Sequence, residues 1–164
     1  MDLKQDLQRI AFQEQTLQFS SFDKATAWEL GTRLKTACEE QGAAVTIEVR
    51  LLRETVFFYS MPGTCAINTD WARRKRNVVE LMELSSYGVG RSFELKGNSL
   101  DSLMGLPLRD YADHGGSFPV FVKGMGCIGA VTVSGLPQRE DHAMVVQVLA
   151  QMLGADPSQL ALEG

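Results

Sequence analysis

The stretch FPVFVKGMGCIGAVTV, residues 118–133, decides the fold of this chain. Residues 118–122 and 127–133 are rich in Val, Ile and Phe, a composition that favours β-strands. Between them, Lys123-Gly124-Met125-Gly126 contains two glycines, which adopt the backbone angles of a tight turn without steric cost. The stretch therefore predicts a β-hairpin.

A second hairpin is predicted upstream of the first. Residues 44–50 alternate apolar and polar side chains, as in a half-buried strand, and residues 55–59 form its partner after a turn at 52–54. Because hairpins rather than βαβ crossovers connect neighbouring strands, we expect an α+β fold. Its sheet would be antiparallel, with helices packed on its faces.

Apolar side chains at helical spacing predict four long helices, at about residues 3–19, 23–41, 69–85 and 137–154. The first is amphipathic and aligns Leu3, Leu7, Ile10 and Leu17. No linker or internal repeat divides the sequence. We therefore expect one domain over residues 1–164, which begins with this amphipathic helix.

Glycines predict where the third helix stops. Gly88 and Gly90 are expected to end it, because glycine disfavours the interior of a helix. Residues 92–116 are then expected to form loop and one short helix.

Composition limits the function. The net charge of −4 argues against nucleic acid as a partner, since phosphate binding requires a basic surface. No window is apolar enough to span a membrane, and the charged N-terminus lacks the apolar region of a signal peptide. Three scattered cysteines form no disulfide framework, as expected of a cytoplasmic protein.

Four segments together resemble a known family: FDKATAWELG (22–31), WARRKRNVV (71–79), DYADHGGSFPV (110–120) and GAVTVSGLPQREDH (129–142). Their combination is similar to the UPF0303 branch of the haem-degrading domain superfamily, whose broader members are the GlcG-like and HbpS-like proteins. The resemblance implies a profilin-like α+β fold, assembly into homodimers or higher homo-oligomers, and haem, another tetrapyrrole or a small anionic molecule as ligand. Broader members carry a Lys-Ala pair in the third helix, where this chain has Lys75-Arg76.

Lys75 is the first candidate ligand-binding residue. It shares a helical stripe with apolar Trp71, Val78 and Met82, whereas Arg73, Arg76, Glu80 and Glu83 are expected to face water. A lysine on such a stripe extends its ammonium to the surface, joins a subunit interface, or points into a pocket, where it would hold an anionic group such as a propionate.

His114 and His142 are the only histidines of the sequence. His114 precedes Gly115 and Gly116, where backbone can approach a ligand closely, and it is a candidate haem-iron ligand or general base. A hydrogen bond that fixes the loop is the alternative role. His142, in the first turn of the last helix, could reach the same end of the sheet; no spacing motif predicts a metal site.

Ser134 and Gly135 join a strand to a helix, so free backbone N–H groups there could bind a carboxylate or phosphate. Glu140 and Asp141 could already supply that negative charge, which would make the turn an ordinary helix cap.

Three functions are compatible with these residues. The first is binding of haem or a related tetrapyrrole, with weak haem degradation. The second is a non-enzymatic homo-oligomeric adaptor that uses Leu3, Leu7, Ile10 and the basic run 73–76. The third is a small-molecule enzyme with His114 as general base, although no nucleophile or phosphate-binding motif is present.

Overall fold

The structure is a computed structural model that describes residues 2–164, so Met1, the first residue of the predicted domain, lies outside the described residues. The elements, in chain order, are α1 (Leu3–Thr16), β1 (Gln18–Phe19), α2 (Lys24–Glu40), β2 (Thr46–Leu51), β3 (Glu54–Ser60), α3 (Ala66–Met82), α4 (Ser86–Lys96), α5 (Leu100–Met104), β4 (Ser117–Val122), β5 (Gly126–Ser134), α6 (Gln138–Leu153) and α7 (Pro157–Leu160).

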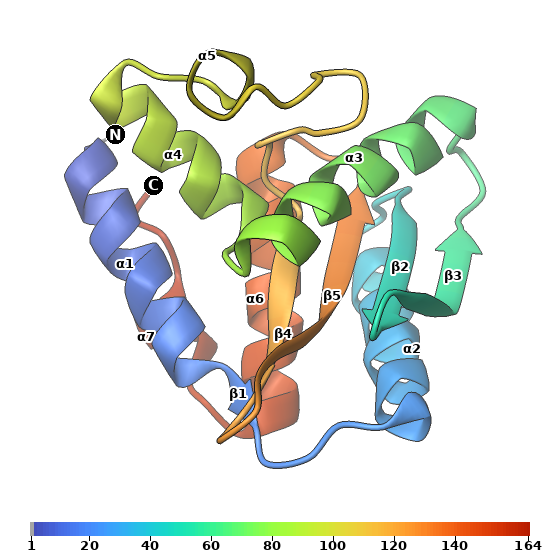
Figure 1. The fold of residues 1–164 in the computed structure, drawn as a ribbon. Helices are drawn as coiled ribbons and strands as arrows, with labels where there is room; N and C mark the ends of the chain where they lie inside the picture. Colours follow the sequence, from blue (N-terminus) through green and yellow to red (C-terminus); the bar gives the residue numbers. More distant parts are fainter. Residues whose placement is uncertain (1) are drawn as a thin grey trace.

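The five strands form one sheet in the order β1-β4-β5-β2-β3. Both predicted hairpins, β2–β3 and β4–β5, are antiparallel, and β2 pairs with β5 in the same sense. Helices α2 and α6 pack on one face of the sheet and α3 on the other, while α1 lies against α4 (Figure 1). The predicted α+β architecture is confirmed, with one addition: the short β1 runs parallel to β4.

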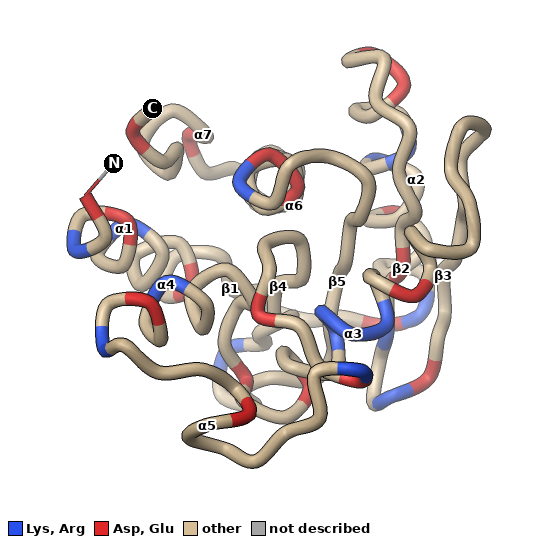
Figure 2. The backbone as a smooth tube through the Cα atoms, turned by 90° about the horizontal axis from the view of Figure 1, so that it is seen from above, with Lys and Arg blue, Asp and Glu red and all other residues tan. Residues whose placement is uncertain are grey.

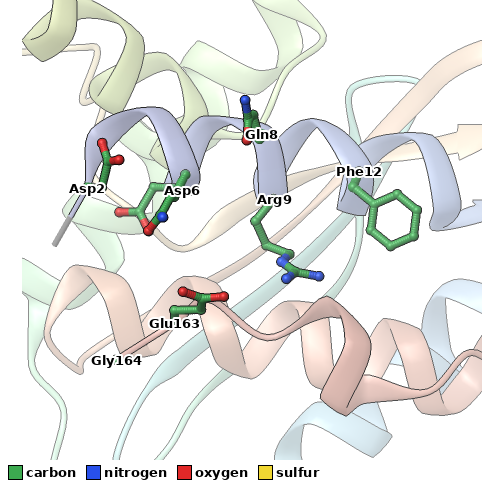
Figure 3. Close-up of a pocket in the computed structure, with 8 residues that line it drawn as sticks. Asp2, Asp6, Gln8, Arg9, Phe12, Glu163 and Gly164 are labelled. Carbon is green, nitrogen blue, oxygen red and sulfur yellow. The ribbon is translucent and has the colours of Figure 1, made fainter.

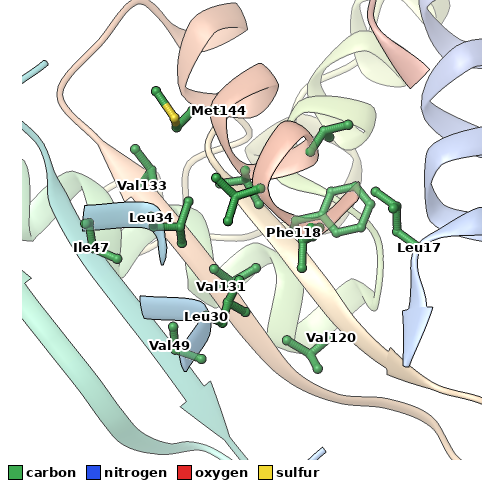
Figure 4. Packing of buried hydrophobic residues seen from close by; sticks show 14 of the residues in the cluster. Leu17, Leu30, Leu34, Ile47, Val49, Phe118, Val120, Val131, Val133 and Met144 are labelled. Atoms are coloured by element: carbon green, nitrogen blue, oxygen red, sulfur yellow. The ribbon is translucent and has the colours of Figure 1, made fainter. Parts of the chain in front are cut away.

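The main core fills the space between the sheet and helices α2 and α6 (Figure 4). Leu30 and Leu34 of α2 belong to this core together with Val131 and Val133 of β5, and all four are fully buried. Gly31 faces the same layer, where an added Cβ would lie 2.3 Å from the Phe57 ring. This helix therefore approaches the sheet more closely than any side chain at position 31 would allow.

Two helix boundaries were predicted wrongly. The third helix ends at Met82, and its cap residue Glu83 adopts a left-handed conformation, with φ of 56°. Gly88 and Gly90 do not end it, because they lie inside a separate helix, α4, which Ser85 caps through a bond from the Gly88 N–H. The predicted loop therefore begins only after residue 96.

The first helix is also shorter than predicted. It ends at Thr16, and Gln18–Phe19 leave the helical path to form β1 beside β4. Sheet pairing at Phe19, which is 4% exposed, outweighs the helical spacing of the preceding residues.

Figure 2 shows the Lys and Arg positions along α3 in blue, and this basic run does not face water throughout, since the Lys75 side chain is 5% exposed. Arg76 Nε lies 3.1 Å from Glu48 Oε1 of β2, and Arg50 Nε lies 2.5 Å from Glu80 Oε1. The expectation that Arg76 and Glu80 face solvent is wrong, because the sheet beneath α3 carries partner charges of opposite sign. Among residues 2–164 no helix has the length and apolar character needed to cross a bilayer.

Candidate functional site

A pocket of about 270 Å³ lies between α3 and the end of β5. Figure 1 shows where these two elements come together. Its walls come from α3, the loop before β4, the β5–α6 turn and the first turn of α6; they are Asn68, Trp71, Lys75, His114, Ser134, Gly135, Leu136, Gln138 and Asp141. The structure thus brings together four of the candidates predicted from sequence, Lys75, His114, Ser134 and Gly135.

Lys75 points inward and already has an internal partner. Its Nζ donates to Asp141 Oδ2 at 2.8 Å and to the Val133 carbonyl at 3.4 Å. Burial lowers the pKa of Lys75 and raises the pKa of Asp141, and in each case the charge of the other residue opposes the shift. Of the three roles considered for Lys75, exposure at the surface is ruled out within this chain, since the residue is 4% exposed.

The helix N-terminus at the β5–α6 turn is occupied by the same carboxylate. The Leu136 N–H donates to Asp141 Oδ1 at 3.0 Å, and the Gly135 N–H donates to Oδ2 at 3.3 Å. Asp141 therefore supplies the negative charge that the free N–H groups require. An incoming anion has to find other donors.

Gly115 and Gly116 allow close contacts within the protein. A Cβ on Gly115 would lie 2.1 Å from the Gln138 carbonyl oxygen. On Gly116, whose φ is +133°, a Cβ would lie 2.3 Å from the Val133 carbonyl oxygen and 2.9 Å from Lys75 Nζ. The two glycines therefore let the loop close over the Lys75–Asp141 pair.

His114 stands half-exposed at the pocket wall. Its ring packs edge-on against Trp71 at 4.9 Å between ring centroids. Burial lowers the pKa of His114, and Asp113 partly offsets this, so the ring is neutral at pH 7. Asp113 Oδ1 lies 3.7 Å from Nδ1, beyond hydrogen-bond distance, and its negative charge favours a proton on Nδ1 over one on Nε2.

Side chains of α3 hold the loop that carries His114. Arg74 Nη2 donates to the Leu108 carbonyl at 2.6 Å and its guanidinium stacks over Trp71, while Asn77 Nδ2 donates to the Asp110 carbonyl at 2.8 Å. Part of the basic run thus anchors residues 108–112, a role that its sequence did not reveal.

His142 does not join this site. It is fully buried, and its Nε2 lies 2.8 Å from Gln13 Oε1 of α1. Burial lowers the pKa of His142 to about 3. Gln13 also donates to the Leu160 carbonyl at 2.7 Å, so His142 ties α6 to α1 and α7.

Asn68, Gln138 and Asp141 are site residues that sequence reasoning either missed or treated only as helix capping. Lys75 and Asp141 are 66 residues apart in sequence, and no local spacing connects them. Asn68 lies two turns before Lys75 on α3, which is the one signal that could have linked it to the same stripe.

A larger recess, about 680 Å³, lies between α1 and the C-terminal residues (Figure 3). Asp2, Asp6, Arg9, Phe12 and Glu163 line it. Arg139 already pairs with Asp6 at 2.8 Å, and residues 2–164 contain no group of three or more His, Cys, Asp or Glu placed to hold a metal ion. The one buried polar side chain of this recess, Asp6, is therefore already paired.

Comparisons with known proteins agree with this fold. The model of the family described as haem degrading protein HbpS-like matches residues 22–150. A UPF0303 protein of Azotobacter vinelandii is 53% identical over 163 residues, which cover 99% of this chain and 98% of that protein.

Two solved structures are similar in fold. The crystal structure of the Ybr137w protein has a TM-score of 0.83 at 25% identity, with 90% of this chain and 87% of that chain covered. A PduOC:Heme complex has a TM-score of 0.67 at 16% identity, with 80% of this chain and 94% of that chain covered. By its family match and its close relative, the chain belongs to the HbpS-like haem-degrading protein family, in the group of UPF0303 proteins.

Proposed function

We propose that this protein binds haem or a related tetrapyrrole at the pocket of Lys75 and His114, with His114 as the iron ligand. One observation carries the proposal: His114 presents a neutral imidazole at a pocket wall, with a carboxylate beside Nδ1. A histidine that ligates iron through Nε2 commonly donates a hydrogen bond from its other nitrogen to a carboxylate, and Asp113 lies on that side of the His114 ring. The similar fold of the PduOC:Heme complex supports a haem ligand.

The residues that line the pocket fit a haem group in their chemistry, whereas the pocket is small for it. A pocket of about 270 Å³ lies just below the roughly 300–1,000 Å³ of sites that enclose a drug-sized ligand. Trp71 and His114 are the pocket residues that would contact the macrocycle. Trp71 and His114 offer planar surfaces for it. The iron, when bound, would supply redox chemistry, and slow haem degradation is the activity to test.

Lys75 is a weaker candidate for a propionate than its sequence position suggested, because Asp141 neutralises it. Arg74 carries the alternative positive charge. Its Nε and Nη2 are bonded to the Leu108 carbonyl, which leaves Nη1 for an anionic group.

The adaptor function has less support. Of its proposed contact residues, Ile10 is 2% exposed within this chain, and Arg73 and Arg76 pair with internal carboxylates. Homo-oligomer formation and a cytoplasmic location stay predictions. A small-molecule enzyme with His114 as base also stays a prediction, and the neutral imidazole is the observation that favours it.

The test is a visible-absorption titration with haemin. The wild type should give a saturable, stoichiometric Soret shift, which His114→Ala should weaken by about tenfold or more, as expected for loss of an axial ligand. Cys65→Ser and Met125→Ala serve as matched controls, because both side chains are exposed and both residue types ligate haem iron. A titration that is unsaturable, or identical in wild type and His114→Ala, would contradict the proposal.

A further inference from the structure

The wall of the pocket at the end of β5, here called its inner end, carries the hydroxyl of Ser134. Ser134 closes β5 on the side that faces α3, and it is 3% exposed. Its hydroxyl lines the pocket and makes no hydrogen bond to any of residues 2–164. This hydroxyl is therefore available to donate to a ligand atom in the pocket.

Two amide side chains beside it are oriented by the backbone. Asn68 Oδ1 accepts from the Cys65 N–H at 3.0 Å, and Gln138 Oε1 accepts from the Gly115 N–H at 3.1 Å. Because each amide oxygen is engaged, each remaining group is an NH₂ donor. Asn68 comes from α3 and Gln138 from α6, so the two donors line different walls of the same pocket.

The one carboxylate among the pocket residues is already engaged. Asp141 accepts from Lys75, Gly135 and Leu136, and its negative charge is cancelled by Lys75 Nζ at 2.8 Å. Lys75 directs two of its three N–H bonds to Asp141 and the Val133 carbonyl, which leaves one more donor. Apart from His114 Nε2 and the lone pairs of the Ser134 hydroxyl, the unused hydrogen-bonding groups of this pocket are therefore donors.

From these contacts we infer that the inner end of the pocket is an oxyanion site that receives a carboxylate, and that Asn68, Ser134 and Gln138 supply its donors. The carboxylate could come from either of two sources, and the first of them rests on the proposed function. That source is a propionate of a tetrapyrrole held by His114. The other source is a free small carboxylic acid, and both present the same planar group to the donors.

The first experiment uses acetate and needs no haem. Trp71 lines the pocket, whereas Trp28 lies on α2 and is exposed, so its indole N–H signal is an internal reference in the NMR spectrum. Sodium acetate should shift the Trp71 indole signal saturably and leave the Trp28 signal in place. Acetamide, which has the same shape without the charge, and sodium chloride at equal ionic strength should not.

The variants keep the internal bonds and remove one donor each. Asn68→Asp and Gln138→Glu retain the oxygens that accept from Cys65 and Gly115, but they replace the donor by a carboxylate oxygen, so acetate affinity should fall by about tenfold or more. Ser134→Ala should weaken acetate by roughly 3- to 10-fold. Gln151→Glu is the matched control, since it adds the same charge to α6 outside the pocket.

Haemin and its dimethyl ester separate the two sources. If a propionate occupies the site, the ester binds about tenfold more weakly than haemin, and Ser134→Ala weakens haemin but not the ester. If a free acid occupies it, haemin and the ester bind alike while acetate still saturates; both results support the oxyanion site. Saturable acetate without any haemin binding removes the tetrapyrrole proposal alone. A Trp71 signal that acetate does not shift, or acetate affinity unchanged in Asn68→Asp and Ser134→Ala, overturns the oxyanion site itself.

Discussion

Lys75 and Asp141 form a buried ion pair, with Nζ and Oδ2 2.8 Å apart, that joins α3 on one face of the sheet to α6 on the other. The side chains are 5% and 1% exposed. Because the pair also holds the Val133 carbonyl and two N–H groups of the β5–α6 turn, it fixes the floor of the candidate pocket.

The stabilities contributed by the two partners of this pair should be coupled. Lys75→Met leaves a buried carboxylate without its cation, and we expect a loss of about 3–5 kcal/mol in the free energy of unfolding. The double variant Lys75→Met/Asp141→Asn should lose less than the sum of the two single variants, as measured by urea unfolding. Lys24→Met, which breaks the exposed pair with Glu54, is the control and should change little. Additive losses in the double variant would show that the pair is not coupled.

Gly116→Ala should open the same region for a steric reason. Its Cβ would lie 2.3 Å from the Val133 carbonyl oxygen and 2.9 Å from Lys75 Nζ, so the loop has to move away from the ion pair. Gly124→Ala is the matched control, because Gly124 also has positive φ but nothing within 4 Å of the added Cβ. Gly124→Ala should lose about 1 kcal/mol and Gly116→Ala at least twice as much in urea unfolding. Equal losses would mean that only backbone strain matters at residue 116.

His142 should make the protein less stable in acid. Its folded pKa of about 3 lies below the usual histidine value of about 6.5, so the unfolded chain binds the extra proton first. The stabilisation is therefore complete above pH 6.5 and is lost as pH falls towards 3, with a slope of up to about 1.4 kcal/mol per pH unit. Comparing urea unfolding of wild type and His142→Gln from pH 7 to 4 isolates this slope, because the carboxylates contribute to both. Parallel curves would show that His142 is not buried as a neutral ring.

The loop that carries His114 should loosen when α3 releases it. Asn77→Ala removes the donor to the Asp110 carbonyl, and loss of one such bond should raise amide exchange in residues 109–114 by roughly 3- to 10-fold in hydrogen–deuterium exchange. Asn98→Ala, at an exposed position after α4, should not change exchange in this segment. Unchanged exchange in Asn77→Ala would leave Arg73 and Arg74 as the residues that hold the loop.

Much of the fold could be predicted from local sequence. The two hairpins and helices α2 and α6 follow from side-chain periodicity and turn residues, which act over a few positions. Helix α4 was missed because Gly88 and Gly90 indicate a stop. Gly90 is needed for another reason: a Cβ there would lie 2.2 Å from the Asp113 carbonyl oxygen, so the glycine admits the His114 loop beside the helix.

In the candidate site, too, some features follow from local sequence and others only from the packing of distant elements. The sequence by itself determined the α+β architecture, the apolar stripe that turns Lys75 inward, and the strand-to-helix turn at Ser134 and Gly135, because these depend on neighbouring residues. Only the tertiary structure decided that Asp141 neutralises Lys75, that His114 shares their pocket, and that His142 packs against α1 instead. Such pairings depend on how distant elements pack. Side-chain periodicity acts over a few neighbouring residues, so it cannot predict which two buried charges will form a pair.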